Sequence, residues 1–130
     1  MQTRDVEFNS CGDTIRGTLY LPDGAKNPPL VVMAGGWCYV KEIVMPYYAD
    51  DFVEIGCACL IFDYRCFGDS DGLPRQHIDP WGQIEDYRNA VSFAKTLDDV
   101  DTDRIGVWGI SYSGGHAICV AALDTRVKFA

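Results

Sequence analysis

The chain has 130 residues, of which 48% are hydrophobic and 23% charged. This composition is typical of one globular domain and unlike a disordered or low-complexity chain. Eleven Lys and Arg against nineteen Asp and Glu give a formal net charge of −8, which argues against nucleic acid or an anionic membrane as a partner. No apolar run approaches the roughly 18 residues that a membrane span needs, and the polar stretch Met1–Ser10 is unlike a secretory signal.

The six cysteines allow two interpretations, a disulfide framework or reduced thiols packed as small apolar side chains. Most have apolar or aromatic neighbours in the sequence, and the chain is long enough to fold around its own core. We therefore expect reduced thiols in a cytoplasmic protein. Cys57 and Cys59 form a C-x-C pair on one strand face, and His77 and His116 are the only histidines, so we expect no metal site.

Two kinds of strand are predicted. Alternating polarity over Asp5–Ser10 and Thr14–Leu21 predicts an antiparallel hairpin, with Cys11–Asp13 as its turn. Continuous apolar runs are expected for strands buried on both faces of a parallel sheet. They occupy Leu30–Ala34, Cys57–Phe62 and Arg104–Ile110.

Helical spacing of apolar residues predicts three helices, over Lys41–Ile55, Pro80–Leu97 and Tyr112–Leu123. The expected inner-face residues are Ile43, Val44, Tyr47, Tyr48 and Phe52 in the first helix, and Trp81, Ile84, Tyr87, Val91 and Ala94 in the second. Val127–Ala130 begins like a further strand.

A hairpin followed by alternating strands and helices predicts an α/β fold with a mostly parallel sheet, in a single domain over residues 1–130. An edge strand ending at Ala130 would leave apolar residues and backbone groups unpaired. We therefore expect a fragment, truncated after the helix Tyr112–Leu123, with an exposed sheet edge that favours self-association.

The segment Gly109–Gly115 carries the strongest functional signal. It joins an apolar strand to an apolar helix, the context of a nucleophile elbow that lifts a serine above the sheet. Ser111 is the candidate nucleophile, and the small residues Gly109 and Ser113 let strand and helix pass closely. The usual G-x-S-x-G pattern is altered, because Ser113 takes its fifth position and Gly114 follows. The alternatives are a plain turn or a phosphate-binding loop, but G-x-G-x-x-G is absent and no Lys follows.

Three stretches together resemble the N-terminal half of the α/β-hydrolase fold: Val31–Trp37, Asp63–Gly72 and the elbow. The first looks like the strand and turn that carry the family's oxyanion loop, with Gly35 where the family has His. The second is similar to the family's D-x-R-G-x-G-x-S-x-G loop. The chain looks closest to dienelactone-hydrolase-like and Xaa-Pro-dipeptidyl-peptidase-like members and to polyketide transferases.

The resemblance implies an acyl-enzyme mechanism on a small-molecule ester or thioester. Ser111 matches the nucleophile, and the backbone N–H groups of Tyr112 and Trp37 match the two oxyanion donors. Hydrolysis and acyl transfer both remain open, and no metal or organic cofactor is implied. Trp37 and Tyr39 are candidates to line an apolar acyl pocket or, equally, to pack at its rim.

An acid and a histidine that match the family order are missing. After Ser111 the chain holds only Asp124 and His116, whereas the fold requires Ser, then Asp or Glu, then His. We expect His116 to be packed or on the helix surface, pointing away from the serine. His77 precedes Ser111 and is out of order. A second hypothesis is therefore a non-catalytic fragment or binding module.

The remaining polar residues have structural interpretations. Asp69, Asp71 and Asp79 are expected to form a solvated acidic stretch rather than a cation site, because their spacing differs from that of a Ca²⁺ loop. Arg65 and Asp63 are expected to pair beneath this loop.

Overall fold

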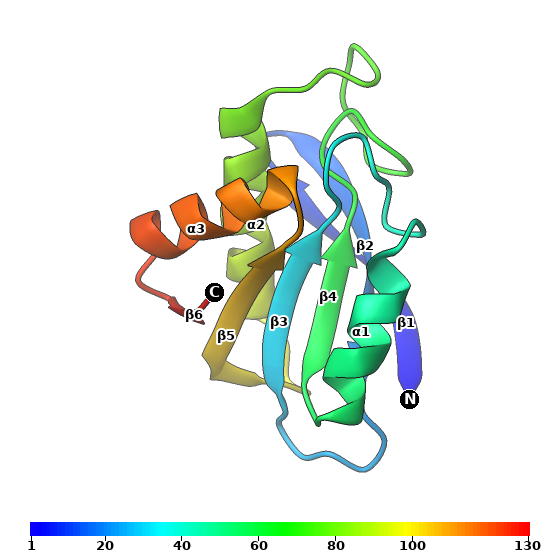
Figure 1. Cartoon of the computed structure of the whole chain (residues 1–130), viewed down its shortest axis with the longest axis vertical. Helices are drawn as coiled ribbons and strands as arrows, with labels where there is room; N and C mark the ends of the chain where they lie inside the picture. Colours follow the sequence, from blue (N-terminus) through cyan, green and yellow to red (C-terminus); the bar gives the residue numbers. More distant parts are fainter.

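The computed structural model describes residues 1–130 as a six-stranded sheet with the strand order β1-β2-β4-β3-β5-β6 (Figure 1). The strands are β1 (Gln2–Ser10), β2 (Asp13–Leu21), β3 (Pro29–Ala34), β4 (Ala58–Phe62), β5 (Asp101–Gly109) and β6 (Val127–Phe129). The helices are α1 (Met45–Glu54), α2 (Pro80–Ala94) and α3 (Tyr112–Leu123). The predicted α/β class and the order of elements are confirmed.

The sheet is antiparallel at one edge and parallel elsewhere. β1 pairs antiparallel with β2 and β2 antiparallel with β4, while β3 pairs parallel with β4 and β5, and β5 with β6. The hairpin turn places Cys11 and Gly12 at positive φ, +53° and +100°, as two-residue hairpin turns require. Alternate residues of β1 and β2 are buried, whereas all five residues of β4 are, which follows the predicted contrast between hairpin and central strands.

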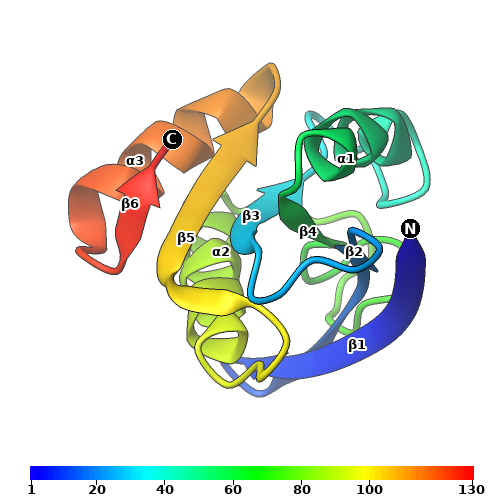
Figure 2. The same cartoon turned by 90° about the horizontal axis from the view of Figure 1, so that it is seen from below.

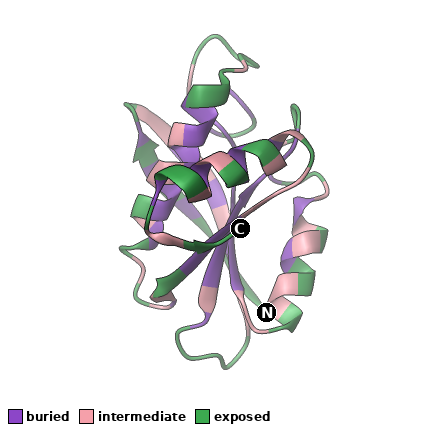
Figure 3. Cartoon of the chain, turned by 60° about the vertical axis from the view of Figure 1, so that its left-hand side comes forward, coloured by how far each residue is buried: buried purple, intermediate pink, exposed green.

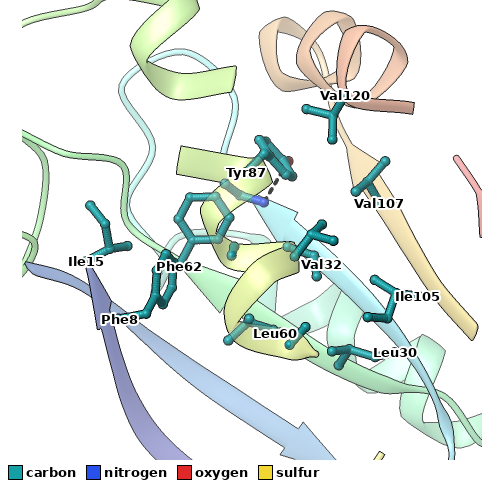
Figure 4. Close-up of a cluster of buried hydrophobic side chains, with 14 of the residues drawn as sticks. Phe8, Ile15, Leu30, Val32, Leu60, Phe62, Tyr87, Ile105, Val107 and Val120 are labelled. Atoms are coloured by element: carbon teal, nitrogen blue, oxygen red, sulfur yellow. Dashed lines mark hydrogen bonds between the residues drawn. The ribbon is translucent and has the colours of Figure 1, made fainter. Parts of the chain in front are cut away.

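Helices cover both faces of the sheet. Figure 2 shows α1 on one side and α2 on the other. Met45 and Ala49 of α1 pack with Val31 and Met33 on the first face. The larger core lies on the opposite face, where α2 and α3 cover β3, β4 and β5 (Figure 4). All residues of β3 and β4 are buried except Pro29 at the start of β3 (Figure 3), because both strands face a helix layer on each side.

Helix α1 is shorter than predicted. It begins at Met45 rather than Lys41 because the preceding residues form a turn, with the Ile43 N–H donating to the Val40 carbonyl at 2.9 Å and Val44 at φ +66°. The predicted inner face was therefore wrong in part, since Ile43 and Tyr47 are exposed.

Helix α2 begins at Pro80 as predicted and ends at Ala94, three residues earlier than predicted. The inner-face prediction is confirmed for Ile84, Tyr87, Val91 and Ala94. It was wrong for Trp81, which lies in the first turn of α2 and is 68% exposed. None of the helices is long and apolar enough to cross a membrane.

All six cysteines are free. Cys59 and Cys66 are buried, but Cys11 and Cys38 are exposed. Cys57 lies just before β4 and packs against the same apolar cluster as Cys59. Burial raises the pKa of the Cys57 and Cys66 thiols, which keeps them protonated and unreactive at neutral pH.

Candidate active site

Ser111 lies between β5 and α3, at the carboxyl end of the parallel strands (Figure 1). Its backbone is strained, with φ +57° and ψ −120°, and the residue is exposed. A β-carbon at Gly109 would lie 2.1 Å from the Ser113 carbonyl oxygen, so only glycine fits where strand and helix cross. A serine presented on a strained strand–turn–helix matches the geometry of a nucleophile elbow.

Ser113 closes the turn around Ser111. Its hydroxyl accepts a hydrogen bond from the Ile110 N–H at 2.9 Å and donates to the Ile110 carbonyl at 3.0 Å. The serine that replaces the usual glycine is therefore small enough for the crossing, and it also fixes the Ile110 backbone through two hydrogen bonds. A β-carbon at Gly114 would have its nearest contact at 3.5 Å, so the crossing requires Gly109 and not Gly114.

The loop after β3 passes directly beside the serine. A β-carbon on Gly36 would lie 3.5 Å from Ser111 Cβ and 3.2 Å from the Ile110 carbonyl. The next residue, Trp37, is 56% exposed, and its ring meets the Tyr112 ring edge-on with centroids 4.8 Å apart. The structure thus brings Trp37, from the first of the three motifs, beside Ser111 and Tyr112 of the elbow.

Helix α3 directs its N-terminus at the same place. Tyr112 is its first residue, and the N–H groups of a first helical turn have no intrahelical acceptor. These groups and the positive end of the helix dipole favour negative charge there. An oxyanion formed at a carbonyl attacked by Ser111 would lie in this field.

Neither histidine is arranged to activate Ser111. His116 is 4% exposed, and its Nε2 lies 3.0 Å from Gln83 Oε1. Its ring packs edge-on against Tyr112 at 4.6 Å, and burial lowers its pKa. His116 is a packed, neutral side chain, as expected. His77 is exposed in the loop before α2.

Asp124 is paired with Arg126 and is not beside Ser111. It follows α3, at the opposite end of that helix from Ser111. Its carboxylate accepts from Arg126 Nε at 2.8 Å and Nη2 at 2.5 Å, and the Arg126 hydrogen bond holds its pKa below the usual range. The described residues therefore contain no acid–histidine pair beside the serine.

The acidic loop residues are engaged in structural contacts. Asp69 pairs with Lys41, Asp71 pairs with Arg16 at 2.7 Å, and Asp79 caps α2 by accepting from the Trp81 N–H at 3.2 Å. Each of these three carboxylates thus has a partner within the chain.

Lys41 is a residue that sequence reasoning missed. Carboxylates of Glu42, Asp63 and Asp69 lie within 4.8 Å of one another, a spacing that would suit a metal ion. The Lys41 ammonium group contacts all three and supplies the positive charge itself. Burial alone would lower the pKa of Lys41, but hydrogen bonds to Asp69 and Glu42 raise it.

The predicted pair of Arg65 and Asp63 was wrong. Asp63 accepts from the Lys41 N–H at 2.7 Å, whereas Arg65 donates to Asp86 of α2 from Nε at 2.9 Å and Nη2 at 2.6 Å. Ser10 donates to the same buried carboxylate at 2.6 Å. Only the tertiary fold brings α2 against the hairpin, so Asp86 gave no signal in the local sequence.

The sequence profile of the X-Pro dipeptidyl-peptidases (S15 family) matches residues 12–128. The chain belongs to this family. Among curated relatives of this S15 chain, the thiohydrolase aneE of Aspergillus aculeatus is 47% identical over 125 residues. The quorum-quenching protein AidA of Acinetobacter baumannii is 42% identical over 123 residues. The match covers 95% of this chain in both cases, but 39% and 40% of those proteins. The chain therefore spans about two fifths of the length of these relatives.

Solved structures place the S15 chain among the α/β hydrolases. The α/β hydrolase GrgF from Penicillium sp. sh18 superposes with a TM-score of 0.92 at 35% identity, covering 98% of this chain and 44% of GrgF. DcsB, solved in complex with its substrate analogue, gives the same TM-score at 38% identity, covering 98% of this chain and 43% of DcsB. The resemblance to this fold and to its Xaa-Pro-peptidase-like and polyketide transferase members is confirmed.

Proposed function

We propose that this chain carries the nucleophile and the oxyanion donors of an enzyme that hydrolyses or transfers acyl groups held as esters or thioesters. The observation that carries the proposal is the position of Ser111, strained and exposed at the start of α3 and directly beside Gly36. Relatives named thiohydrolase and polyketide transferase, 47% and 40% identical, support this substrate class.

In the proposed first step, Ser111 Oγ attacks the acyl carbonyl carbon and loses its proton to a base. The N–H groups of Tyr112 and Trp37 stabilise the oxyanion. Removing one such donor typically lowers the rate by about 10²–10³-fold. The alkoxide or thiolate then leaves with a proton, and an acyl ester remains on Ser111. Water completes hydrolysis, or an alcohol accepts the acyl group.

We propose that the base and its orienting acid come from outside the 130 described residues. Two observations support this: His116 is held by Gln83 at 3.0 Å, and the relatives are more than twice as long as the portion matched here. The exposed Trp37 ring beside Tyr112 is proposed to border the acyl pocket.

The same lack of an activating base favours a second candidate, a binding module that holds acyl compounds without turning them over. The two are separated by incubating the chain with p-nitrophenyl butyrate in imidazole buffer, which supplies a base, and measuring intact mass. We expect one butyryl group on wild type, none on Ser111→Ala, and normal labelling of the control Ser92→Ala, an exposed serine on α2. Equal labelling of wild type and Ser111→Ala would reject the enzyme proposal.

A further inference from the structure

One buried hydroxyl joins the two strands that lead to the site. Tyr87, on the inner face of α2, is fully buried. Its hydroxyl accepts a hydrogen bond from the Ala34 N–H at 2.9 Å (Figure 4). It also donates to the Trp108 carbonyl at 2.9 Å. Ala34 is the last residue of β3, and Trp108 is the penultimate residue of β5. The hydroxyl therefore bridges two neighbouring parallel strands where both leave the sheet.

Both strands continue directly into the candidate site. Gly36 follows Ala34 by two positions, and Ser111 follows Trp108 by three. A β-carbon on Gly36 would lie 3.5 Å from Ser111 Cβ, so the two backbones run side by side at this point. The Tyr87 hydroxyl bonds to the ends of β3 and β5, and the register pairs Ala34 with Gly109 there. The distance between these strand ends therefore also sets the distance between Gly36 and Ser111.

The Tyr87 ring is held firmly enough to act as a spacer. It meets the Phe62 ring edge-on at 5.1 Å, within the larger core. Burial raises the pKa of its hydroxyl, and a neutral phenol can donate and accept at once. Two further hydroxyls fasten the same backbone, since Tyr64 donates to the Gly35 carbonyl at 3.3 Å and Ser113 bonds to Ile110.

We propose that Tyr87 is a positioning residue whose hydroxyl sets the distance between the Trp37 oxyanion donor and the Ser111 nucleophile. This inference rests on the proposed function. Its physical basis is that a misplacement of about 1 Å in a reacting site can lower a rate by about 10²-fold. Tyr87 touches no reacting atom and acts through the backbone of β3 and β5.

The test uses Tyr87→Phe, which keeps the ring and removes only the bridging oxygen. Ile61→Val is the control, because Ile61 is fully buried on the opposite face of the sheet, away from this hydroxyl. The butyrylation rate of Ser111 is measured against ester concentration, at a temperature where circular dichroism shows every variant folded. We expect Tyr87→Phe to lower the maximal rate by about 10-fold or more with little change in the half-saturating concentration, and Ile61→Val to match wild type.

A second readout does not depend on chemistry. The ¹H–¹⁵N resonances of the Trp37 and Tyr112 amides should shift in Tyr87→Phe more than those of the β1–β2 hairpin. Unchanged amide resonances, or a maximal rate equal to that of Ile61→Val, would overturn the positioning role. Shifted amides together with labelling that survives Ser111→Ala would instead reject the proposed function and leave the positioning geometry supported.

Discussion

The crossing of β5 and α3 should tolerate no side chain at Gly109. A β-carbon there would lie 2.1 Å from the Ser113 carbonyl oxygen and 2.4 Å from its carbon. Both are backbone atoms, so relief requires the helix to move away from the strand by about 1.3 Å, the difference between 2.1 Å and the 3.4 Å at which ordinary contacts begin. Overpacking of this kind costs about 3 kcal/mol at the upper end of its usual range.

That cost converts into a measurable melting shift. The unfolding entropy is about 2.1 cal/mol/K per residue. In a chain of this length, a loss of about 3 kcal/mol in unfolding free energy therefore lowers the melting temperature by about 11 °C. We therefore expect Gly109→Ala to melt about 11 °C below wild type by circular dichroism, and to lose butyrylation of Ser111. The shift follows from the elbow and requires no change elsewhere in the fold.

Gly114→Ala is the matched control, five residues further along the same turn and helix. A β-carbon there meets nothing closer than 3.5 Å, and replacing a helical glycine by alanine stabilises by about 0.5–1 kcal/mol. We expect its melting temperature to rise by about 2–4 °C. A Gly109→Ala protein whose melting temperature lies within about 2 °C of the wild-type value would refute the packing argument.

The remaining predictions concern ion pairs and the sheet edge. Because Arg126 lowers the pKa of Asp124, the stabilisation is present above the unfolded-state value of about 3.9 and is lost as the pH falls through the lower folded value. Asp124→Asn should therefore lower the free energy of unfolding by about 1–2 kcal/mol at pH 7, and by progressively less below pH about 4. Urea denaturation measures this loss, and an equal loss at pH 7 and pH 2 would contradict the prediction. Asp86→Ala leaves the half-buried Arg65 guanidinium without its carboxylate, and should cost about 3–5 kcal/mol, with a loss below 1 kcal/mol counting against it. The short strand β6 lies at the edge of the sheet and pairs only with β5, and an open edge favours pairing with another chain. Sedimentation of the 130-residue chain should therefore show association that grows with concentration; a monomer at every concentration would reject this.

The local sequence was sufficient to predict an element when the pattern that indicates it lies within a single segment. Alternation in the hairpin, the continuous apolar runs and the altered elbow motif predicted the element order and the turn at Ser111. Helix α1 was predicted poorly because the turn before it depends on Val44 at positive φ, which a β-branched residue rarely adopts. The inner face of α1 consequently fell on Met45 and Ala49 rather than on Ile43 and Tyr47.

By itself, the sequence determined the α/β class, the hairpin and the identity of Ser111 as the candidate nucleophile, because periodicity and motif spacing are local properties. Only the tertiary structure decided which charges pair. Asp86 with Arg65 and Lys41 with Asp63 join residues 21 and 22 positions apart. It also decided that Gly36 lies against Ser111 and that the Tyr87 hydroxyl bridges the strands beneath them. Such contacts depend on how the sheet orders its strands, and no single segment specifies that order.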